Sequence, residues 1–568
     1  MSGLAPVSVL LLNLFSQKYP AIGESHGLSA VAGALRKRFG PAGEDSSEIR
    51  VDLHVLDMVA QGSESLAPAA RMIREKEVRV LAVGVPYGTY RLLADHFAEL
   101  REALPEEDTL VVFGGSLPTY LGSRILKDVE RTAFVVLGEA EVAVPSLIEA
   151  WVHGESPVSV PNLLYLDRAT GQEVRNPRRL VSLDDHGLPY RDHLPDIHRV
   201  GGQIFVETSR GCSWAACTFC LRGLTDISGR SHEYRRRSPE LVARDLATLA
   251  ALGISEVTLA DEDFLGTSLE ETEDFVRALT CRLPARMEFG ASCTVHSVYS
   301  RRDDPETDLR RRKLLEVLAG AGLTRVFLGV ESCSPGQLRR YAKGHTREES
   351  LLAMRRLQEL GIQVEVGVIL MDPMCTIEEV AQSLEFMSET GMAQVSSGLS
   401  NELRLQEAST YLRMLLRYQR ESSTTLITGE LDVDTLSYPY RFADSRVTEL
   451  SRHITRWAER VHPVYYPAKS LTRFGKAGVF GTSEAGRELK AAVEEFRLQY
   501  ARATIAAIRE LRKDADPGRP IGEIVRPALA RLARQLHTAL LSTDESVRRH
   551  PVVAHALAET ESPRYGIP

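Results

Sequence analysis

The chain has 568 residues, of which 43% are hydrophobic and 26% are charged, and its formal net charge is −8. These values lie close to those of folded globular proteins, so they exclude a mainly disordered, collagenous or fibrous chain. The negative balance also argues against a nucleic-acid partner. No apolar run approaches the ~20 residues that a membrane-spanning helix needs, and no signal peptide is recognisable at the start. We therefore expect a cytoplasmic protein without a membrane partner.

The first 153 residues alternate short apolar runs with amphipathic stretches. Strands are predicted at residues 7–12, 50–56, 78–84, 109–113 and 133–137. Helices are predicted between them, for example at residues 28–39 and 90–104. Short apolar strands joined by helical crossovers indicate a doubly wound, Rossmann-like domain built on a parallel sheet.

Glycines and polar residues follow three of these strands, at the edge where ligands of such sheets bind. The candidate residues are Tyr87, Gly114, Gly115, Ser116, Gly138 and Glu139. Glycines there let the backbone approach a ligand closely, although they also serve simple tight turns. The three-glycine fingerprint of dinucleotide-binding domains is missing after the first strand, which disfavours a nicotinamide or flavin dinucleotide.

The rest of the chain divides into a connector, a second α/β region and a helical region. The predicted connector covers residues 154–200 and contains a hairpin at 162–174. In residues 201–408, strands are predicted at 203–208, 256–260, 288–294, 325–331, 363–371 and 394–405. Six strand–helix units indicate a partial (β/α)6 barrel, with its chemistry at the carboxyl ends of the strands. Residues 409–568 are predicted to be mostly helical, with helices at 493–511 and 524–541.

Three of the seven cysteines lie within nine residues, directly after the first predicted barrel strand: Cys212, Cys217 and Cys220. An odd number of cysteines in a long chain argues against a disulfide framework. Soft thiolates in one loop suit zinc or an iron–sulfur cluster. A closed zinc site needs a fourth ligand, for which His232 is the candidate, whereas a cubane held by three cysteines leaves one iron open. Buried thiols without metal are the third alternative.

This Cys-x4-Cys-x2-Cys loop, with Phe219 before its last cysteine, resembles the loop of the radical SAM superfamily, where the first gap is usually one residue shorter. Further matching segments are Asp261-Glu262-Asp263-Phe264, Gly329-Val330-Glu331-Ser332 and Lys343-Gly344-His345-Thr346. The first domain, with Gly114-Gly115-Ser116 and Gly138-Glu139-Ala140-Glu141, resembles the cobalamin-binding class of these enzymes. The resemblance covers residues 5–405.

The resemblance implies three cofactors. The three cysteines would hold a 4Fe–4S cluster whose open iron chelates S-adenosylmethionine (SAM). Residues expected to bind SAM are Phe219, Gly329, Glu331 and Ser332. Cobalamin would lie against Tyr87, Gly114, Gly115, Ser116, Gly138 and Glu139, with neither its own base nor a histidine below the cobalt. His54 is interpreted as an ordinary strand residue.

The implied activity is C-methyl transfer. A methyl group from SAM would pass through methylcobalamin to a carbon of a small-molecule or amino-acid-like substrate of specialised metabolism, such as antibiotic biosynthesis, with an external electron donor. Glu262 and Asp263 are the candidate catalytic residues, as a base, a substrate ligand or a ligand of the open iron. A carboxylate on that iron would favour polar transfer, as in the tryptophan methylase of this family. Two alternatives stay open, a cobalamin-dependent isomerase or ring-contracting enzyme and a non-catalytic cobalamin or SAM sensor.

Overall fold

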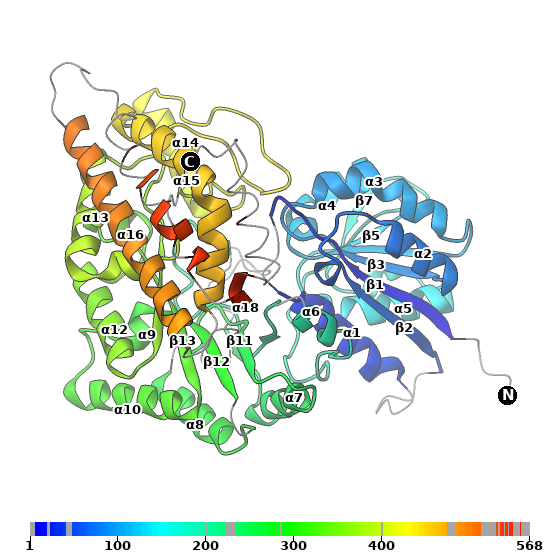
Figure 1. Ribbon diagram of the computed structural model, residues 1–568. Coiled ribbons are helices and arrows are strands. Elements are labelled where there is room, and N and C mark those ends of the chain that lie inside the picture. Colours follow the sequence, from blue (N-terminus) through cyan, green and yellow to red (C-terminus); the bar gives the residue numbers. More distant parts are fainter. Residues whose placement is uncertain are drawn as a thin grey trace.

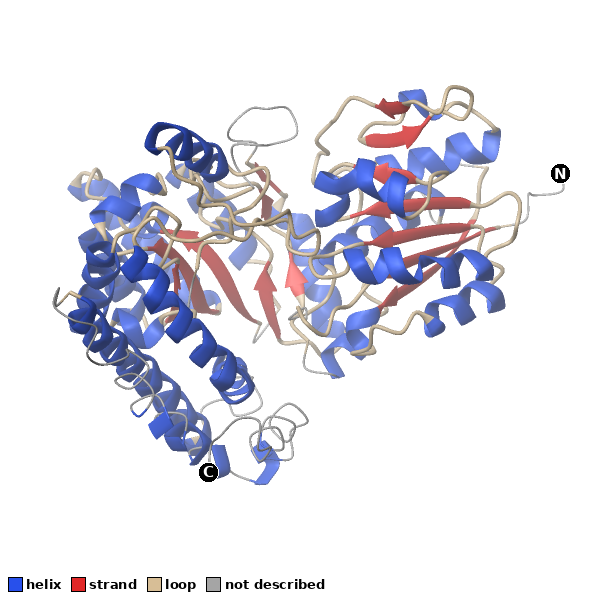
Figure 2. Ribbon diagram, turned by 90° about the horizontal axis from the view of Figure 1, so that it is seen from above, coloured by secondary structure: helices blue, strands red, loops and turns tan. Residues whose placement is uncertain are grey.

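The computed structural model shows two α/β regions side by side, with helices of the C-terminal part against the second of them (Figure 1). It describes residues 6–19, 23–40, 48–199, 202–221, 234–266, 268–284, 287–398, 402–473 and 483–512, and a few residues between 527 and 557. Figure 2 shows the two sheets as separate layers, each with helices around it. No helix in this part of the chain is long and apolar enough to cross a membrane.

The N-terminal sheet has the strand order β2-β1-β3-β4-β5-β6-β7. Its parallel strands are β1 (Val7–Asn13), β2 (Val51–Asp57), β3 (Val80–Gly84), β4 (Leu110–Gly114) and β5 (Phe134–Val136). The predicted hairpin forms β6 (Leu163–Leu166) and β7 (Glu173–Arg175), which add to β5 in antiparallel direction. The chain winds in both directions from β1, and ligands of such sheets bind at this switch point, beyond the strands' carboxyl ends.

Helices cover both faces of this sheet, as a doubly wound fold requires. One apolar core lies under α1 (His26–Phe39) and α5 (Ala143–His153). The other lies under α2 (Ala67–Glu75), α3 (Tyr90–Ala103) and α4 (Ser116–Asp128). Strand β1 is buried along its whole length because it contributes side chains to both cores.

The second sheet has the order β14-β13-β12-β11-β8, all parallel. Its strands are β8 (Phe205–Val206), β11 (Glu256–Leu259), β12 (Glu288–Thr294), β13 (Leu323–Glu331) and β14 (Gln363–Val368). The helices on its outer face are α7 (Pro239–Ala251), α8 (Leu269–Thr280), α10 (Pro305–Ala321), α12 (Arg347–Glu359) and α13 (Ile377–Thr390). Alternate strand residues such as Val326, Leu328 and Val330 face these helices and are buried.

The sixth predicted barrel strand, at residues 394–405, is not a strand in the described residues. Met392–Val395 form a 3-10 turn, and only Ser396 and Glu402 make single parallel bridges, to Val366 and Met371. The segment contains Ser396, Ser397, Gly398, Ser400 and Asn401, residue types that strands disfavour. The prediction was wrong because the apolar residues around this polar stretch suggested one continuous run.

Three helices and one irregular segment follow the barrel. The helices are α14 (Thr410–Ser422), α15 (Ser445–Arg473) and α16 (Glu484–Leu511), and the short α18 (Glu545–Arg548) lies beyond them. Helix α16 packs against α13 and α15, so the barrel core continues into this region. Residues 424–444 are not helical, and apolar residues of this segment join the core of the N-terminal sheet. Within the helix predicted at residues 524–541, the described residues (527, 530, 531, 534–538, 540 and 541) are helical.

Candidate functional site

The cysteine loop follows β9 (Ser209–Arg210), which pairs in a two-stranded ribbon with β10 (Arg235–Arg236), a strand that comes after the loop in the chain. Backbone and side-chain hydrogen bonds join the loop to the turn after α11 (Pro335–Arg340). Trp214 donates its indole N–H to the carbonyl of Ala342 over 2.8 Å. The Thr218 N–H donates to the carbonyl of Tyr341, and its hydroxyl donates to the carbonyl of Arg340. The loop is therefore fixed from the fourth strand's side of the barrel.

Gly344 explains how Trp214 can lie so close to this turn. A Cβ atom at Gly344 would stand 2.4 Å from the Trp214 ring, and the residue has a φ of +70°. Only glycine is suited to both conditions. Trp214 also stacks on His296, with ring centroids 4.5 Å apart. The longer first gap of the cysteine motif is accommodated at Ala215, which is buried and has a φ of +48°.

Glu262 and Asp263, the predicted acidic residues after β11, contact the cysteine loop. Glu262 accepts a hydrogen bond from the N–H of Gly211, and the buried Asp263 accepts one from the hydroxyl of Ser213. Asp263 also accepts hydrogen bonds from the Thr294 N–H and the Ser297 hydroxyl, so its carboxylate is engaged on several sides. Burial raises the pKa of Asp263. In this arrangement Asp263 supports the loop, whereas Glu262 lies half-buried at its start.

The turn after α11 brings a buried cation, Lys343, to the cysteines and to Glu331 at the end of β13. The Nζ atom of Lys343 lies 3.8 Å from Glu331, and both side chains are largely buried. Burial opposes the charge of Lys343, but the nearby Cys217, Glu331 and Cys212 raise its pKa above the usual value. Glu331 has a φ of +69°, a conformation rare outside glycine that occurs preferentially at functional sites.

The other residues predicted to bind SAM do not all lie at the cysteine loop. Gly329 lies beside both Glu331 and Lys343, because a Cβ atom there would make ordinary contacts, 3.4 Å from Oε1 and 3.5 Å from Nζ. Phe219 packs edge-to-face on Tyr341. Ser332 is fully buried, and its hydroxyl bonds to Gln337 and Ser383 within the barrel core. The structure thus brings Gly329 and Glu331 to the cysteine loop, while the hydroxyl of Ser332 turns inward.

All three cysteines of the loop are free thiols and half-buried. Burial raises the pKa of Cys212, and it raises the pKa of Cys217 to about 11. Among the described residues, no three His, Cys, Asp or Glu side chains converge as ligands of one metal ion. His232, the candidate zinc ligand, lies outside the described residues. The remaining cysteines are Cys281, which is exposed, and Cys293, Cys333 and Cys375, which are buried.

A buried hydrogen-bond centre that the sequence analysis missed lies behind the loop. Asp372, after β14, is fully buried and accepts hydrogen bonds from Arg340, Tyr341 and Tyr411. The backbone groups of the same three residues bond to Thr218 between the last two cysteines. Asp372 therefore fixes the segments that hold Thr218. Its only sequence signal was its place in the segment 371–376 after a barrel strand.

The edge of the N-terminal sheet at the carboxyl ends of its strands is built largely from backbone. A Cβ atom at Gly114 would find no heavy atom within 4 Å, so this strand end borders open space. Gly115 has a φ of +106° and comes directly before α4, whose first residue is Ser116. Gly138 also has a positive φ, and its N–H donates to the Thr119 hydroxyl. These four predicted residues form one edge.

Tyr87 and Glu139 lie at the same edge but contact other parts of the chain. The Tyr87 hydroxyl accepts a hydrogen bond from Gln406, which belongs to the segment after the barrel. That segment is tied to the N-terminal domain by Arg91, which forms ion pairs with Asp432 and Asp434. Glu139 forms ion pairs with Arg210 and Arg235, which lie on the ribbon strands before and after the cysteine loop. His54 lies in β2 beside Asp52, as expected for a strand residue.

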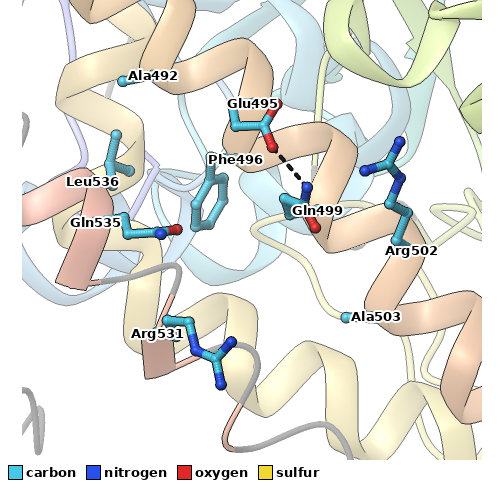
Figure 3. A pocket seen from close by; sticks show the side chains of 9 residues that line it. All are labelled: Ala492, Glu495, Phe496, Gln499, Arg502, Ala503, Arg531, Gln535 and Leu536. Carbon is cyan, nitrogen blue, oxygen red and sulfur yellow. Dashed lines mark hydrogen bonds between the residues drawn. The ribbon is translucent and has the colours of Figure 1, made fainter.

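A separate hollow of about 700 Å³ lies between α16 and the residues Arg531, Gln535 and Leu536 (Figure 3). Its lining includes Phe496, Arg502 and Arg531, and the side chain of Gln499 donates to Glu495 over 2.6 Å. None of its lining residues belongs to the cysteine loop or to the edge of the N-terminal sheet.

Comparison with known proteins agrees with this geometry. Residues 206–387 match the radical SAM superfamily. The matched residues contain the cysteine loop and strands β11 to β14 of the barrel. Over 505 residues the chain is 24% identical to 4′-phospho-dehydrooxetanocin synthase of Priestia megaterium, a match that covers 79% of this chain and 66% of the relative. The chain therefore spans about two thirds of the length of that curated relative.

Two solved structures resemble the chain well beyond this domain. The cobalamin-dependent radical enzyme OxsB, with aqua-cobalamin and SAM bound, is 19% identical and covers 98% of this chain and 84% of its own, with a TM-score of 0.78. The radical SAM methyltransferase TsrM from Kitasatospora setae, with tryptophan and a SAM analogue bound, is 18% identical, with coverages of 76% and 82% and a TM-score of 0.57. Another TsrM structure holds cobalamin and a 4Fe–4S cluster.

These findings confirm the resemblance to cobalamin-dependent radical SAM enzymes and the α/β fold class that the sequence predicted. The three cofactors predicted from the sequence are those bound by the two relatives of similar fold. The chemical outcome of the reaction and its substrate are a separate question.

Proposed function

We propose that the protein is a cobalamin-dependent radical SAM enzyme that transfers a methyl group from SAM to a carbon of a small-molecule or amino-acid-like substrate. The observation that carries the proposal is that Arg210 and Arg235, in the ribbon beside the cysteine loop, form ion pairs with Glu139 and Glu141 beside the open glycine edge of the N-terminal domain. Two reactive groups held by separate domains but facing one another are what a transfer between cofactors requires.

The cysteine loop fits an iron–sulfur cluster in its chemistry. Three thiols in one loop supply soft ligands, and the buried ammonium of Lys343 offsets the negative charge that a thiolate-bound cluster brings. Cysteines that hold a cubane each bind a different iron, so their sulfur atoms need not converge on one point. Cys212, Cys217 and Cys220 would hold the cluster, and Glu331 would contact the polar part of SAM beside its open iron.

The glycine edge fits a large planar cofactor. The free space in front of Gly114 is space that any side chain would fill, and Gly115 and Gly138 expose backbone on either side of it. Cobalamin bound there would supply a carrier for the methyl group. Tyr87 would orient its ring system, and the segment around Gln406 would help to exclude water from the space between the domains.

The overall reaction balances with an external electron donor. Per turnover the substrate exchanges a C–H bond for a C–CH3 bond, and its hydrogen atom leaves in 5′-deoxyadenosine. One SAM becomes S-adenosylhomocysteine, a second becomes methionine and 5′-deoxyadenosine, and a low-potential one-electron protein donor supplies two electrons. The protein's own residues bind, orient and shield these groups. Glu262 at the start of the cysteine loop is the candidate substrate ligand in this reaction.

A second candidate function is a ring contraction or isomerisation without net methyl transfer. It is favoured by the similarity to OxsB along nearly the whole chain and to an oxetanocin-forming synthase. The two candidates differ in what happens to SAM in the absence of any substrate.

The deciding experiment incubates the reduced holoenzyme with SAM and cob(I)alamin and measures S-adenosylhomocysteine by mass spectrometry. We expect S-adenosylhomocysteine in amounts at least equal to the enzyme, and a mass gain of about 14 Da in any substrate later found. Formation of 5′-deoxyadenosine alone would favour the second candidate and contradict methyl transfer. A protein that binds no cobalamin would contradict both.

A further inference from the structure

The ribbon that leads into the cysteine loop contains an unfavourable pair. In the antiparallel pairing of β9 with β10, Arg210 lies directly opposite Arg235. Like charges directly opposite one another destabilise a strand pair. A two-stranded ribbon is only marginally stable by itself, so this one needs support from elsewhere in the molecule.

The support comes from the N-terminal domain. One carboxylate oxygen of Glu139 lies 2.5 Å from Arg235 and 3.2 Å from Arg210, so it stands between the two guanidinium groups. Glu141 lies 2.7 Å from Arg210. On the barrel side Glu207 also binds Arg210, at 2.7 Å. The two arginines thus depend on two carboxylates of a different domain.

These carboxylates are held in place before they meet the arginines. Glu139 accepts the N–H of Val181 over 2.6 Å, and its own carbonyl accepts a hydrogen bond from Asn162. The side chains of Glu139 and Glu141 are only 9% and 5% exposed. Burial opposes the charge of Glu141, but Arg210 holds its pKa at about 2. Buried ion pairs with fixed partners are geometrically specific, and loss of one partner is costly.

The position of this contact links the two cofactor edges. Gly138, the residue before Glu139, belongs to the open edge of the N-terminal sheet, and Arg210 precedes Cys212 by two residues. We propose that Glu139, Glu141, Arg210 and Arg235, the inter-domain clamp, are positioning residues that hold the cysteine loop at one distance from the cobalamin-binding edge. The inference rests on the proposed function, because it needs a cofactor on each side.

A fixed distance matters because reacting groups must lie within bonding reach, and a displacement of about 1 Å can cost about a hundredfold in rate. The clamp is therefore expected to affect the step that needs both domains. A step that needs only the cysteine loop, the reductive cleavage of SAM, is expected to proceed without it.

The test uses the full-length protein reconstituted with its cluster and cob(II)alamin, both of which are paramagnetic when the cluster is reduced. Pulsed electron paramagnetic resonance measures the distribution of distances between them in the wild type and in Glu139→Gln, Glu141→Gln and Arg235→Lys. Asp192→Asn is the control, because it removes an exposed ion pair to Arg36 of similar length, 2.9 Å. Iron content, cobalamin affinity and 5′-deoxyadenosine formation are measured in parallel.

We expect a narrow distance distribution in the wild type and in Asp192→Asn. In the three clamp variants the distribution should widen, and S-adenosylhomocysteine formation should fall about tenfold or more, while 5′-deoxyadenosine formation stays within about twofold. An unchanged distribution in variants that hold both cofactors would overturn the clamp alone. Loss of iron from all three variants would also overturn it, because the residues would then support folding of the loop rather than its distance. A wild type without bound cobalamin would overturn the proposed function and the clamp with it.

Discussion

The cysteine loop and the glycine edge of the N-terminal sheet are built by opposite means. The loop is held by side chains: Trp214 and Thr218 bond to the turn after α11, and Ser213 bonds to Asp263 after β11. The edge is defined by missing side chains, since Gly114 faces open space and Gly115 and Gly138 have positive φ angles. A small cluster with covalent ligands needs precisely oriented donors, whereas a large planar cofactor needs room and backbone. The two regions should therefore respond differently to substitution.

The largest effect is expected at the cluster ligands. Cys217→Ala removes one of three thiolates, so iron content after anaerobic reconstitution should fall more than about tenfold and 5′-deoxyadenosine formation should cease. Cys281→Ala is the matched control, because Cys281 is an exposed cysteine outside the loop. If Cys217→Ala retains the iron content of the wild type, the ligand assignment is wrong.

The second-largest effect is expected at Asp372, the buried residue behind the cysteine loop. Asp372→Asn removes the buried charge that Arg340, Tyr341 and Tyr411 share, and loss of one partner of a buried pair costs about 3–5 kcal/mol. We expect a lower free energy of unfolding in urea and a severalfold lower iron content. Glu378→Gln, which removes the more exposed pair with Arg446, should change neither. If Asp372→Asn is destabilised but keeps the iron content of the wild type, Asp372 does not support the cysteine loop.

The ion pair between Glu141 and Arg210, which joins the two regions, should affect how the stability of the protein falls at acidic pH. The folded-state pKa of Glu141, about 2, lies below its ordinary value of 4.5. Its contribution is therefore present above about pH 4.5 and is lost as the pH falls through about 2, at about 3 kcal/mol for a shift of this size. Glu141→Gln should thus lose less stability than the wild type between pH 5 and pH 3 in thermal unfolding. If both proteins lose the same stability between pH 5 and pH 3, Glu141 does not contribute to the contact.

The smallest effect is expected at the glycine edge. Gly114→Val places a side chain in open space, so the fold should tolerate it while cobalamin affinity falls about tenfold, or about 1.4 kcal/mol. Iron content should not change, because the cysteine loop lies on the other domain. Gly320→Val in α10, which also meets nothing within 4 Å, is the control. If Gly114→Val binds cobalamin with the affinity of the wild type, the cofactor binds elsewhere.

The parts of the site that follow local rules were predictable from the sequence. Strand ends, glycines and the cysteine spacing are short-range patterns, and they located Gly114, Gly138, Glu331 and the three cysteines. Contacts between distant segments were not predictable, since the pairing of Arg210 with Glu141 and of Asp372 with Tyr411 exists only after folding. Glu139 shows the difference most clearly: its strand-end position suggested a cofactor contact, and the fold gives its carboxylate two arginine partners.

The sixth barrel strand shows a limit of a different kind. Apolar residues at 395, 403 and 405 suggested a strand, but the described polar residues between them make only two single bridges, Ser396 to Val366 of β14 and Glu402 to Met371 beyond it. A propensity argument over a short window cannot tell a strand from an extended segment that only touches a sheet.

The central claim is that Cys212, Cys217 and Cys220 hold an iron–sulfur cubane with one open iron. Mössbauer spectroscopy of the anaerobically reconstituted protein, enriched in ⁵⁷Fe, tests this claim directly before and after addition of SAM. The account predicts about four irons per chain in one cluster and a change at a single iron site when SAM is added. Zinc or metal-free thiols in the loop, or a cluster whose spectrum does not respond to SAM, would contradict it.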